Sequence, residues 1–233
     1  MLINLRNALM AGKRLPYDAE VEYLQSSGTQ WINTGVKKTS AMTIDCTFSL
    51  SATNTKAIFG ARTSSTALDR IMLVAVGTNF RFDADMQRSF GTTDTASMFR
   101  FQYDGTNATI TNLTTGTTST SSTPIGDAGV LDISLFGVNT NGVVGLLMQG
   151  MMYAFKIWDN GILVRDYIPV RVGQVGYLYD RVSGKLFGNA GTGDFVVGQD
   201  VVPVEYIESH GTEWIATGVR RRTHRRHLEQ LHH

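Results

Sequence analysis

Apolar and polar residues alternate along much of the chain with the period of two that a half-buried β-strand requires. The clearest run covers residues 42–50, Met-Thr-Ile-Asp-Cys-Thr-Phe-Ser-Leu. Other apolar-rich runs end at clusters of Gly, Asn, Asp or Ser, which favour turns. Besides residues 42–50, strands are predicted at residues 30–34, 57–59, 70–76, 80–85, 98–103, 130–136 and 145–148. The pattern therefore predicts an all-β chain.

Tight reversals are predicted where two such runs meet. The expected hairpins lie in residues 108–123, 151–168 and 176–187. The strongest turn signal is Asn160-Gly161, between two apolar-rich runs, because both residues tolerate the positive φ of a primed hairpin turn. Many short strands joined in this way predict an antiparallel two-sheet jelly-roll sandwich.

Composition agrees with this fold class and argues against some functions. The chain has 233 residues, 42% of them hydrophobic, with 24 Gly and only 4 Pro, which suits many strands and tight turns. The net charge is +1, but residues 220–233 hold five Arg and one Glu, so the remainder is slightly acidic. Such a body is unsuited to nucleic acid. The basic tail is expected to be solvated, with binding to phosphate backbones or to an acidic partner as the alternative, and its native character is left open.

The residue types used in catalysis are scarce in the main part of the chain. All five His lie at or after position 210, and residues 23–204 contain no Glu. The single cysteine, Cys46, allows no intrachain disulfide and is expected to be a small packing residue. No apolar stretch is long enough to span a membrane. The sequence predicts no catalytic residue and no enzyme activity.

One motif occurs twice. Residues 204–219 repeat residues 21–36, with eleven of the sixteen positions identical. The copy is expected to correspond to an edge or seam strand of the sandwich. It either docks as a strand, with Tyr206 and Trp214 as assembly residues, or is a relic of a tandem domain.

The domain organisation follows from these signals. Residues 1–19 are expected to form an N-terminal arm with a short helix that ends near Gly12, serving as a docking or oligomer contact or as an anchor into a larger assembly. The jelly roll is expected at residues 20–199, the partial repeat at 200–219 and the basic tail at 220–233. No signal peptide is recognisable.

Several blocks of the sequence resemble a group of laminin G-like, concanavalin A-like jelly rolls from gut Bacteroidales, other gut bacteria and their phages. The blocks are residues 21–35, 58–63, 80–83, 156–169 and 177–194, in that order. The resemblance covers roughly residues 20–199 and implies this fold. It implies less about activity, since lectins, glycanases, adhesive modules and virion proteins share the fold.

The candidate site residues come from this comparison and from residue chemistry. The Glu-x-Asp-x-x-Glu motif of the related β-glucanases is absent, and the nearest carboxylates are Asp83 and Asp85. These are expected to be solvated edge residues, with calcium binding or catalysis as alternatives, so no cofactor is expected unless calcium binds there. Arg62 and Arg81 are candidates for hydrogen bonds to a sugar, and Trp158 for stacking on one, with ordinary surface roles as alternatives.

Two functions fit these expectations. The first is a non-catalytic, lectin-like protein that binds glycans or surface polysaccharide at a cell or virion surface. The alternative is a structural phage virion protein, either a capsid decoration or a fibre subunit. That protein would assemble through its arm and duplicated strand, as a homo-oligomer or with capsid or tail proteins.

Overall fold

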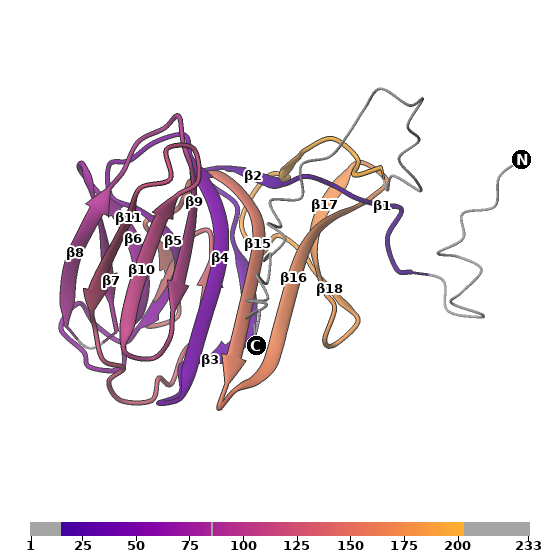
Figure 1. Ribbon diagram of the computed structural model, residues 1–233. Helices are drawn as coiled ribbons and strands as arrows, with labels where there is room; N and C mark the ends of the chain where they lie inside the picture. Colours follow the sequence, from indigo (N-terminus) through magenta and orange to yellow (C-terminus); the bar gives the residue numbers. More distant parts are fainter. Residues whose placement is uncertain (1–14, 85, 203–233) are drawn as a thin grey trace, which may run out of the picture. The chain divides into compact units, whose positions relative to one another are not determined.

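A computed structural model of the chain describes residues 15–84 and 86–202, and every regular element in them is a β-strand. Two sheets pack face to face, and nearly all strand pairs are antiparallel (Figure 1). The prediction of an all-β, two-sheet sandwich is confirmed. In the described part of the chain, no helix is long and apolar enough to cross a membrane.

The first sheet is built around two long neighbouring strands. Its order is β11 (Thr118–Ser122), β10 (Asn107–Asn112), β9 (Met98–Tyr103), β4 (Met42–Leu50), β15 (Gln149–Asp159), β16 (Ile162–Val172), β17 (Val175–Asp180) and β18 (Lys185–Phe187). Three short strands extend it: β1 (Ala19–Glu20) on β16, β2 (Leu24–Ser27) on β15, and β19 (Val196–Val197) on β2. Along β15, residues 155–159 pair with β16 and residues 149–152 pair with β2, so the two strands share one edge of β15.

The second sheet covers the inner face of the first. Its order is β14 (Val143–Gly145), β13 (Val138–Thr140), β5 (Lys56–Arg62), β6 (Ile71–Val76), β7 (Asn79–Asp83) and β8 (Gln87–Thr92), with β12 (Asp132–Leu135) on β5 and β3 (Ile32–Lys37) on β12. The β13–β5 pair is parallel.

The core between the sheets is rich in phenylalanine. Phe59 contacts Phe155 of the opposite sheet at a ring-centroid distance of 5.2 Å, and Phe82 contacts Phe101 at 4.9 Å. Strand β4 alternates between buried and partly exposed residues along its whole length, as its sequence predicted. Cys46 lies in this core, and burial raises the pKa of its thiol, so its expected packing role is confirmed.

A smaller apolar cluster lies on the other side of β6. Ile71 and Leu73 belong to the main core, whereas Met72 and Val74 pack with Val138 of β13. Because both faces of β6 are covered, its sequence is a continuous apolar run rather than an alternating one.

Most strands lie where the sequence predicts them, and the 42–50 and 98–103 ranges match without any shift. The β15–β16 hairpin is also confirmed, with φ of 48° at Asn160 and 75° at Gly161. The 145–148 prediction is wrong: the strand is Val143–Gly145, because Leu146 takes a φ of 52° that ends it. Strands β8 and β13 were not predicted.

The repeated motif contains two strands rather than the single edge or seam strand expected. Within residues 21–36, β2 belongs to the first sheet and β3 to the second, so the turn between them crosses the sandwich. The N-terminal helix, the copy at 204–219 with Tyr206 and Trp214, and the basic tail lie outside the described residues.

Candidate functional site

An open pocket of about 470 Å³ lies where β4, β9, β10 and β15 run side by side. Its lining combines one tryptophan with hydroxyl, amide and carboxylate side chains. The lining residues are Thr43, Ile44, Asp45, Gln102, Tyr103, Asp104, Asn107, Thr109, Trp158 and Gly161. Side chains of β4 and β9 that point away from the core form its floor.

Trp158 is the only one of the predicted ligand-binding residues that lines this pocket. It stands near the end of β15, directly opposite Thr43 of β4, and is partly exposed. The Asn160-Gly161 turn follows two residues later and fixes the end of the strand. An indole ring held in this way offers a flat apolar surface to a ligand.

A carboxylate with fixed partners lies beside the tryptophan. The Arg100 guanidinium donates to Asp45 from Nε to Oδ1 at 3.0 Å and from Nη2 to Oδ2 at 2.5 Å. The Gln102 amide donates to the same Oδ2 at 3.3 Å. This bidentate contact fixes the orientation of Asp45.

Asp104 organises the turn at the edge of the pocket. Its Oδ1 accepts hydrogen bonds from the backbone N–H groups of Thr106 at 2.8 Å and Asn107 at 2.6 Å. These bonds, led by that from Asn107, lower the pKa of Asp104, so the side chain is charged at neutral pH.

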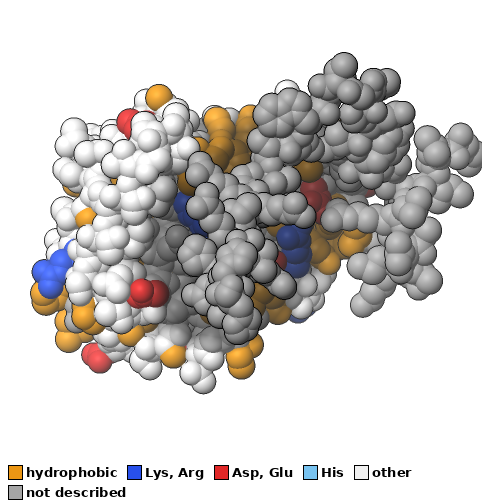
Figure 2. Space-filling model, viewed as in Figure 1, with side chains coloured by type: hydrophobic (Ala, Val, Ile, Leu, Met, Phe, Trp, Pro, Cys, Tyr) orange, Lys and Arg blue, Asp and Glu red, His pale blue; other side chains and the backbone are white. Residues whose placement is uncertain are grey.

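Hydroxyl groups continue from the pocket across β10 and β11. Thr109 contacts Thr120 at 3.0 Å between Oγ1 atoms, and Thr111 contacts Thr118 at 3.1 Å. In Figure 2 the surface over these strands is mostly white, the colour of uncharged polar side chains and backbone. A ligand that forms many hydroxyl hydrogen bonds suits such a surface better than a strongly charged one.

The other predicted site residues lie on the second sheet. Arg62 ends β5, whereas Arg81 and Asp83 are in β7, and the charges of both arginines act on Asp83. Arg62 donates from Nε to Thr140 Oγ1 at 3.1 Å, which ties it to β13. Asp85 lies outside the described residues. The candidates therefore divide between two sheets and do not form one site.

The expectation that Asp83 is a solvated edge residue is wrong. Its side chain is fully buried and lies 3.3 Å from Arg81 Nε. Burial raises its pKa, opposed by the charges of Arg81, Arg70 and Arg62. These arginines make the surroundings unfavourable for a cation such as calcium. In residues 15–84 and 86–202, no group of three His, Cys, Asp or Glu side chains is placed to hold a metal ion.

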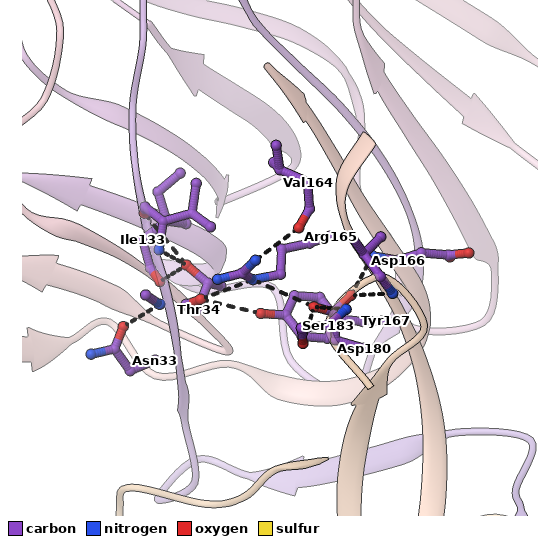
Figure 3. A network of polar contacts seen from close by, with 12 residues as sticks. Asn33, Thr34, Ile133, Val164, Arg165, Asp166, Tyr167, Asp180 and Ser183 are labelled. Atoms are coloured by element: carbon purple, nitrogen blue, oxygen red, sulfur yellow. Dashed lines mark hydrogen bonds and ion pairs between the residues drawn. The ribbon is translucent and has the colours of Figure 1, made fainter. Parts of the chain in front are cut away.

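A polar network next to β3 ties the two sheets together (Figure 3). Arg165 of β16 donates from Nε to the Thr34 carbonyl at 3.2 Å, and the Tyr167 hydroxyl donates to the same oxygen at 3.3 Å. Buried Asp180 lies 3.7 Å from Arg165 Nε and accepts from Ser183 Oγ at 2.6 Å. These groups bond to one another, so the network serves structure.

Of the residues that line the pocket, the sequence pointed to Trp158 as a candidate but to none of the polar residues around it. The alternation in β4 shows that Asp45 points away from the core, which is a usable signal. The sequence does not reveal the strand register that places Asp45 opposite Gln102 of β9 and Lys156 of β15. Those partners are far away in the sequence, so the pocket could not be assembled from it.

The fold defines the class of protein in structural terms: the chain is an all-β sandwich of two largely antiparallel sheets, as the sequence predicted. No protein-family model and no curated protein matches the chain.

Among solved structures, the chain is similar to a protein from Bacteroides ovatus ATCC 8483 that is described provisionally as carbohydrate binding. The TM-score is 0.50 at 10% identity, over 79% of this chain and 62% of that protein's length. Domains LG4-5 of the mouse laminin α1 chain give a TM-score of 0.43 at 12% identity, over 81% of this chain and 48% of theirs. Likeness at this level of identity concerns the fold alone.

Proposed function

We propose that the protein binds carbohydrate, without catalysis, at the pocket around Trp158. The observation that carries the proposal is a partly exposed tryptophan surrounded by threonine, asparagine, glutamine and aspartate side chains. A sugar ring has an apolar face of C–H groups and a rim of hydroxyls. The indole ring suits the face, and the amides and carboxylates suit the rim.

The two carboxylates of the pocket support a binding role. Asp45 is held by Arg100, and Asp104 is engaged with its own turn. A glycosidase needs one carboxyl group with a raised pKa to act as the acid. The pKa of Asp104 is lowered, which suits an acceptor of hydrogen bonds better than a proton donor.

The comparison of folds supports the same proposal. The Bacteroides ovatus protein has a related fold and a provisional carbohydrate-binding description. A fold of this type hosts many functions, so the argument rests on the site itself. An extracellular or surface location for the protein goes with this proposal.

A glycan array probed with the full-length protein tests the proposal. The parent is expected to bind specifically and saturably, and Trp158→Ala to lose at least tenfold in affinity. Trp31→Ala is the matched control, because Trp31 is the other tryptophan among the described residues and does not line the pocket. This variant is expected to bind as the parent does. A blank array from folded protein, or equal binding by Trp158→Ala, would refute the proposal.

The same array, repeated with calcium and with a chelator, tests the metal requirement. The two carboxylates of the pocket, Asp45 and Asp104, already have protein partners, and Asp83 lies among arginines. Binding is therefore expected to persist in the chelator. Loss of binding on chelation would show that a calcium site contributes.

The repeated motif favours a second function, that of a structural virion subunit. The residues proposed for assembly, Tyr206 and Trp214, and residues 1–14 of the predicted arm lie outside the described residues, so this role stays a prediction. Size-exclusion chromatography of a chain that lacks residues 203–233 tests it. Loss of oligomers on deletion would favour assembly through the copy, and an unchanged elution profile would favour a relic.

A further inference from the structure

The outer face of the first sheet continues beyond the Trp158 pocket along β4 and β15. Strand β4 leaves Thr43, Asp45, Thr47 and Ser49 partly exposed on this face. In register, these four residues lie opposite Trp158, Lys156, Ala154 and Met151 of β15. Residues directly opposite each other in a sheet project to the same side. We call this set, together with Tyr153, the β4–β15 strip.

A second aromatic group lies at the far end of the strip from Trp158. Tyr153 sits where the β15 register shifts between Met152 and Ala154. Its hydroxyl is 3.4 Å from Ser49 Oγ, which places it on the same face as the pocket. Its ring packs edge to face against Tyr23 at a centroid distance of 5.7 Å, and both tyrosines are partly exposed.

The spacing of the two aromatic ends suits an extended ligand. From Thr43 to Ser49 the strand advances by about 20 Å, at roughly 3.3 Å per residue. The strip narrows to small side chains in between, where Ala154 faces Thr47. These small side chains leave less to obstruct a ligand chain than the aromatic ends do, and a single sugar ring cannot reach both ends.

Each charged side chain of the strip is paired with an opposite charge on a neighbouring residue. Asp45 is bound by Arg100, and Lys156 Nζ lies 3.6 Å from Asp166 Oδ1. No excess of one sign is available in these pairs to attract a charged polymer. The strip therefore suits an uncharged ligand that offers hydroxyl groups.

From these observations we infer that the β4–β15 strip binds an uncharged linear polysaccharide, laid along β15 with sugar rings on Trp158 and Tyr153. The inference rests on the proposed carbohydrate binding and adds its ligand class and a second subsite. Stacking at two ends joined by one chain raises affinity through effective concentration.

Calorimetry with the full-length protein tests the inference. The probes are linear, uncharged β-linked gluco-, xylo- and manno-oligosaccharides of two and six units. At least one series is expected to bind, with the six-unit chain at least tenfold tighter than the two-unit chain. Tyr153→Ala is expected to remove that gain and leave two-unit binding unchanged, whereas Trp158→Ala weakens both.

Two further variants sharpen the test. Ala154→Gln places a longer side chain on the partly exposed middle of the strip and is expected to weaken only six-unit binding, which keeps the inference testable if Tyr153→Ala does not fold. Tyr179→Ala removes an aromatic ring that packs on Tyr17, two strands away from β15, and is the control expected to bind as the parent does.

The outcomes separate the two proposals. Equal affinity for both lengths, or six-unit binding unaffected by Tyr153→Ala and Ala154→Gln, overturns the second subsite. If array glycans bind through Trp158 but none of the three oligosaccharide series binds, the inferred ligand class, an uncharged linear polysaccharide, is overturned and the proposed function stands. The same holds if binding falls steeply with salt. An unaffected Trp158→Ala variant overturns the proposed function as well.

Discussion

Lys38, directly after β3, is a buried cation held by backbone carbonyls. Its Nζ donates to the carbonyl oxygens of Leu68 and Arg70, each at 3.1 Å, and to that of Ala84. The side chain is almost fully buried, and a buried ammonium group is stable only when it is hydrogen-bonded. One side chain thus joins the segments before β6 and after β7.

We expect Lys38→Met to lower the free energy of unfolding by about 3 kcal/mol, because three carbonyls lose a charged donor. Urea denaturation measures this change. The neighbouring Lys37, which is exposed, offers a matched control, and Lys37→Met is expected to change stability by less than about 0.5 kcal/mol. Equal effects of the two substitutions would contradict the structural role of Lys38.

Asp104 gives a pH dependence with a defined sign. Its pKa in the folded protein is lowered, chiefly by the backbone N–H of Asn107. The stability it contributes is present above the unfolded pKa, about 3.9, and is lost as pH falls through the folded value. Asp104→Asn is expected to cost at most about 1 kcal/mol at pH 7, because solvent screens the group. Denaturation at pH 7 and pH 3 tests this, and a stability difference that grows on acidification would contradict it.

Single residues were predictable from the sequence where their role is local. Cys46 was expected to be a packing residue, and it lies on the buried face of β4 together with Ile44 and Phe48. Trp158 was expected beside an exposed turn, and it lies next to the Asn160-Gly161 turn. Asp83 was not placed correctly, because its burial and its arginine neighbours come from the packing of β5, β6 and β7. Neither the burial of Asp83 nor its arginine neighbours can be inferred from residues adjacent to it in the sequence.

At the scale of elements, the turn of the β15–β16 hairpin also forms part of the pocket wall. Gly161 has a φ of 75° and lines the pocket, and a Cβ added there would meet no atom within 4 Å. The cost of a substitution is therefore backbone strain alone. Gly161→Val is expected to lower stability by about 1–2 kcal/mol. Gly161→Asn should cost less, because Asn tolerates this conformation.

Thermal denaturation of the two Gly161 variants, together with their affinity for a bound glycan, measures both effects. Gly161→Val is expected to weaken glycan binding because the turn fixes the end of the strand that carries Trp158. Equal stability of the Val and Asn variants would show that the turn is not under this constraint.

The network between β3 and β16 is a second element-scale feature. Asp180 is fully buried and accepts hydrogen bonds from the Asp166 N–H and from Ser183 Oγ. Asp180→Ala is therefore expected to cost about 3 kcal/mol in the free energy of unfolding, because these donors lose their acceptor and partly buried Arg165 loses its ion-pair partner. The exposed Arg171–Asp200 pair offers a contrast, and Asp200→Ala is expected to have little effect. Chemical denaturation compares the two variants. A smaller loss for Asp180→Ala than for Asp200→Ala would contradict this account of the network.

Elements were predictable where turn chemistry or alternation is strong, as in β4 and the β15–β16 hairpin. The repeated motif was expected to form one strand, because its sequence does not show that the chain crosses from one sheet to the other within it. In the structure, β2 and β3 lie in different sheets. Strand β13 was missed because its residues Asn139 and Thr140 looked like part of the following turn. Its partner, β5, lies far away in the sequence.

At the scale of the whole sandwich, the two sheets have different outer faces. That of the first sheet presents the Trp158 pocket and the β4–β15 strip. The outer face of the second sheet is partly covered by β13, which packs on Met72 and Val74. The proposed binding surface therefore lies on the first sheet, which packs on the second through the shared aromatic core.

The most direct test of the binding site is a crystal structure of the protein with its strongest glycan from the array. A sugar ring stacked on Trp158, with hydroxyls within hydrogen-bond distance of Asp45, Gln102 or Asn107, is the expected result. A glycan bound to the arginines of the second sheet, or anywhere away from Trp158, would contradict the site.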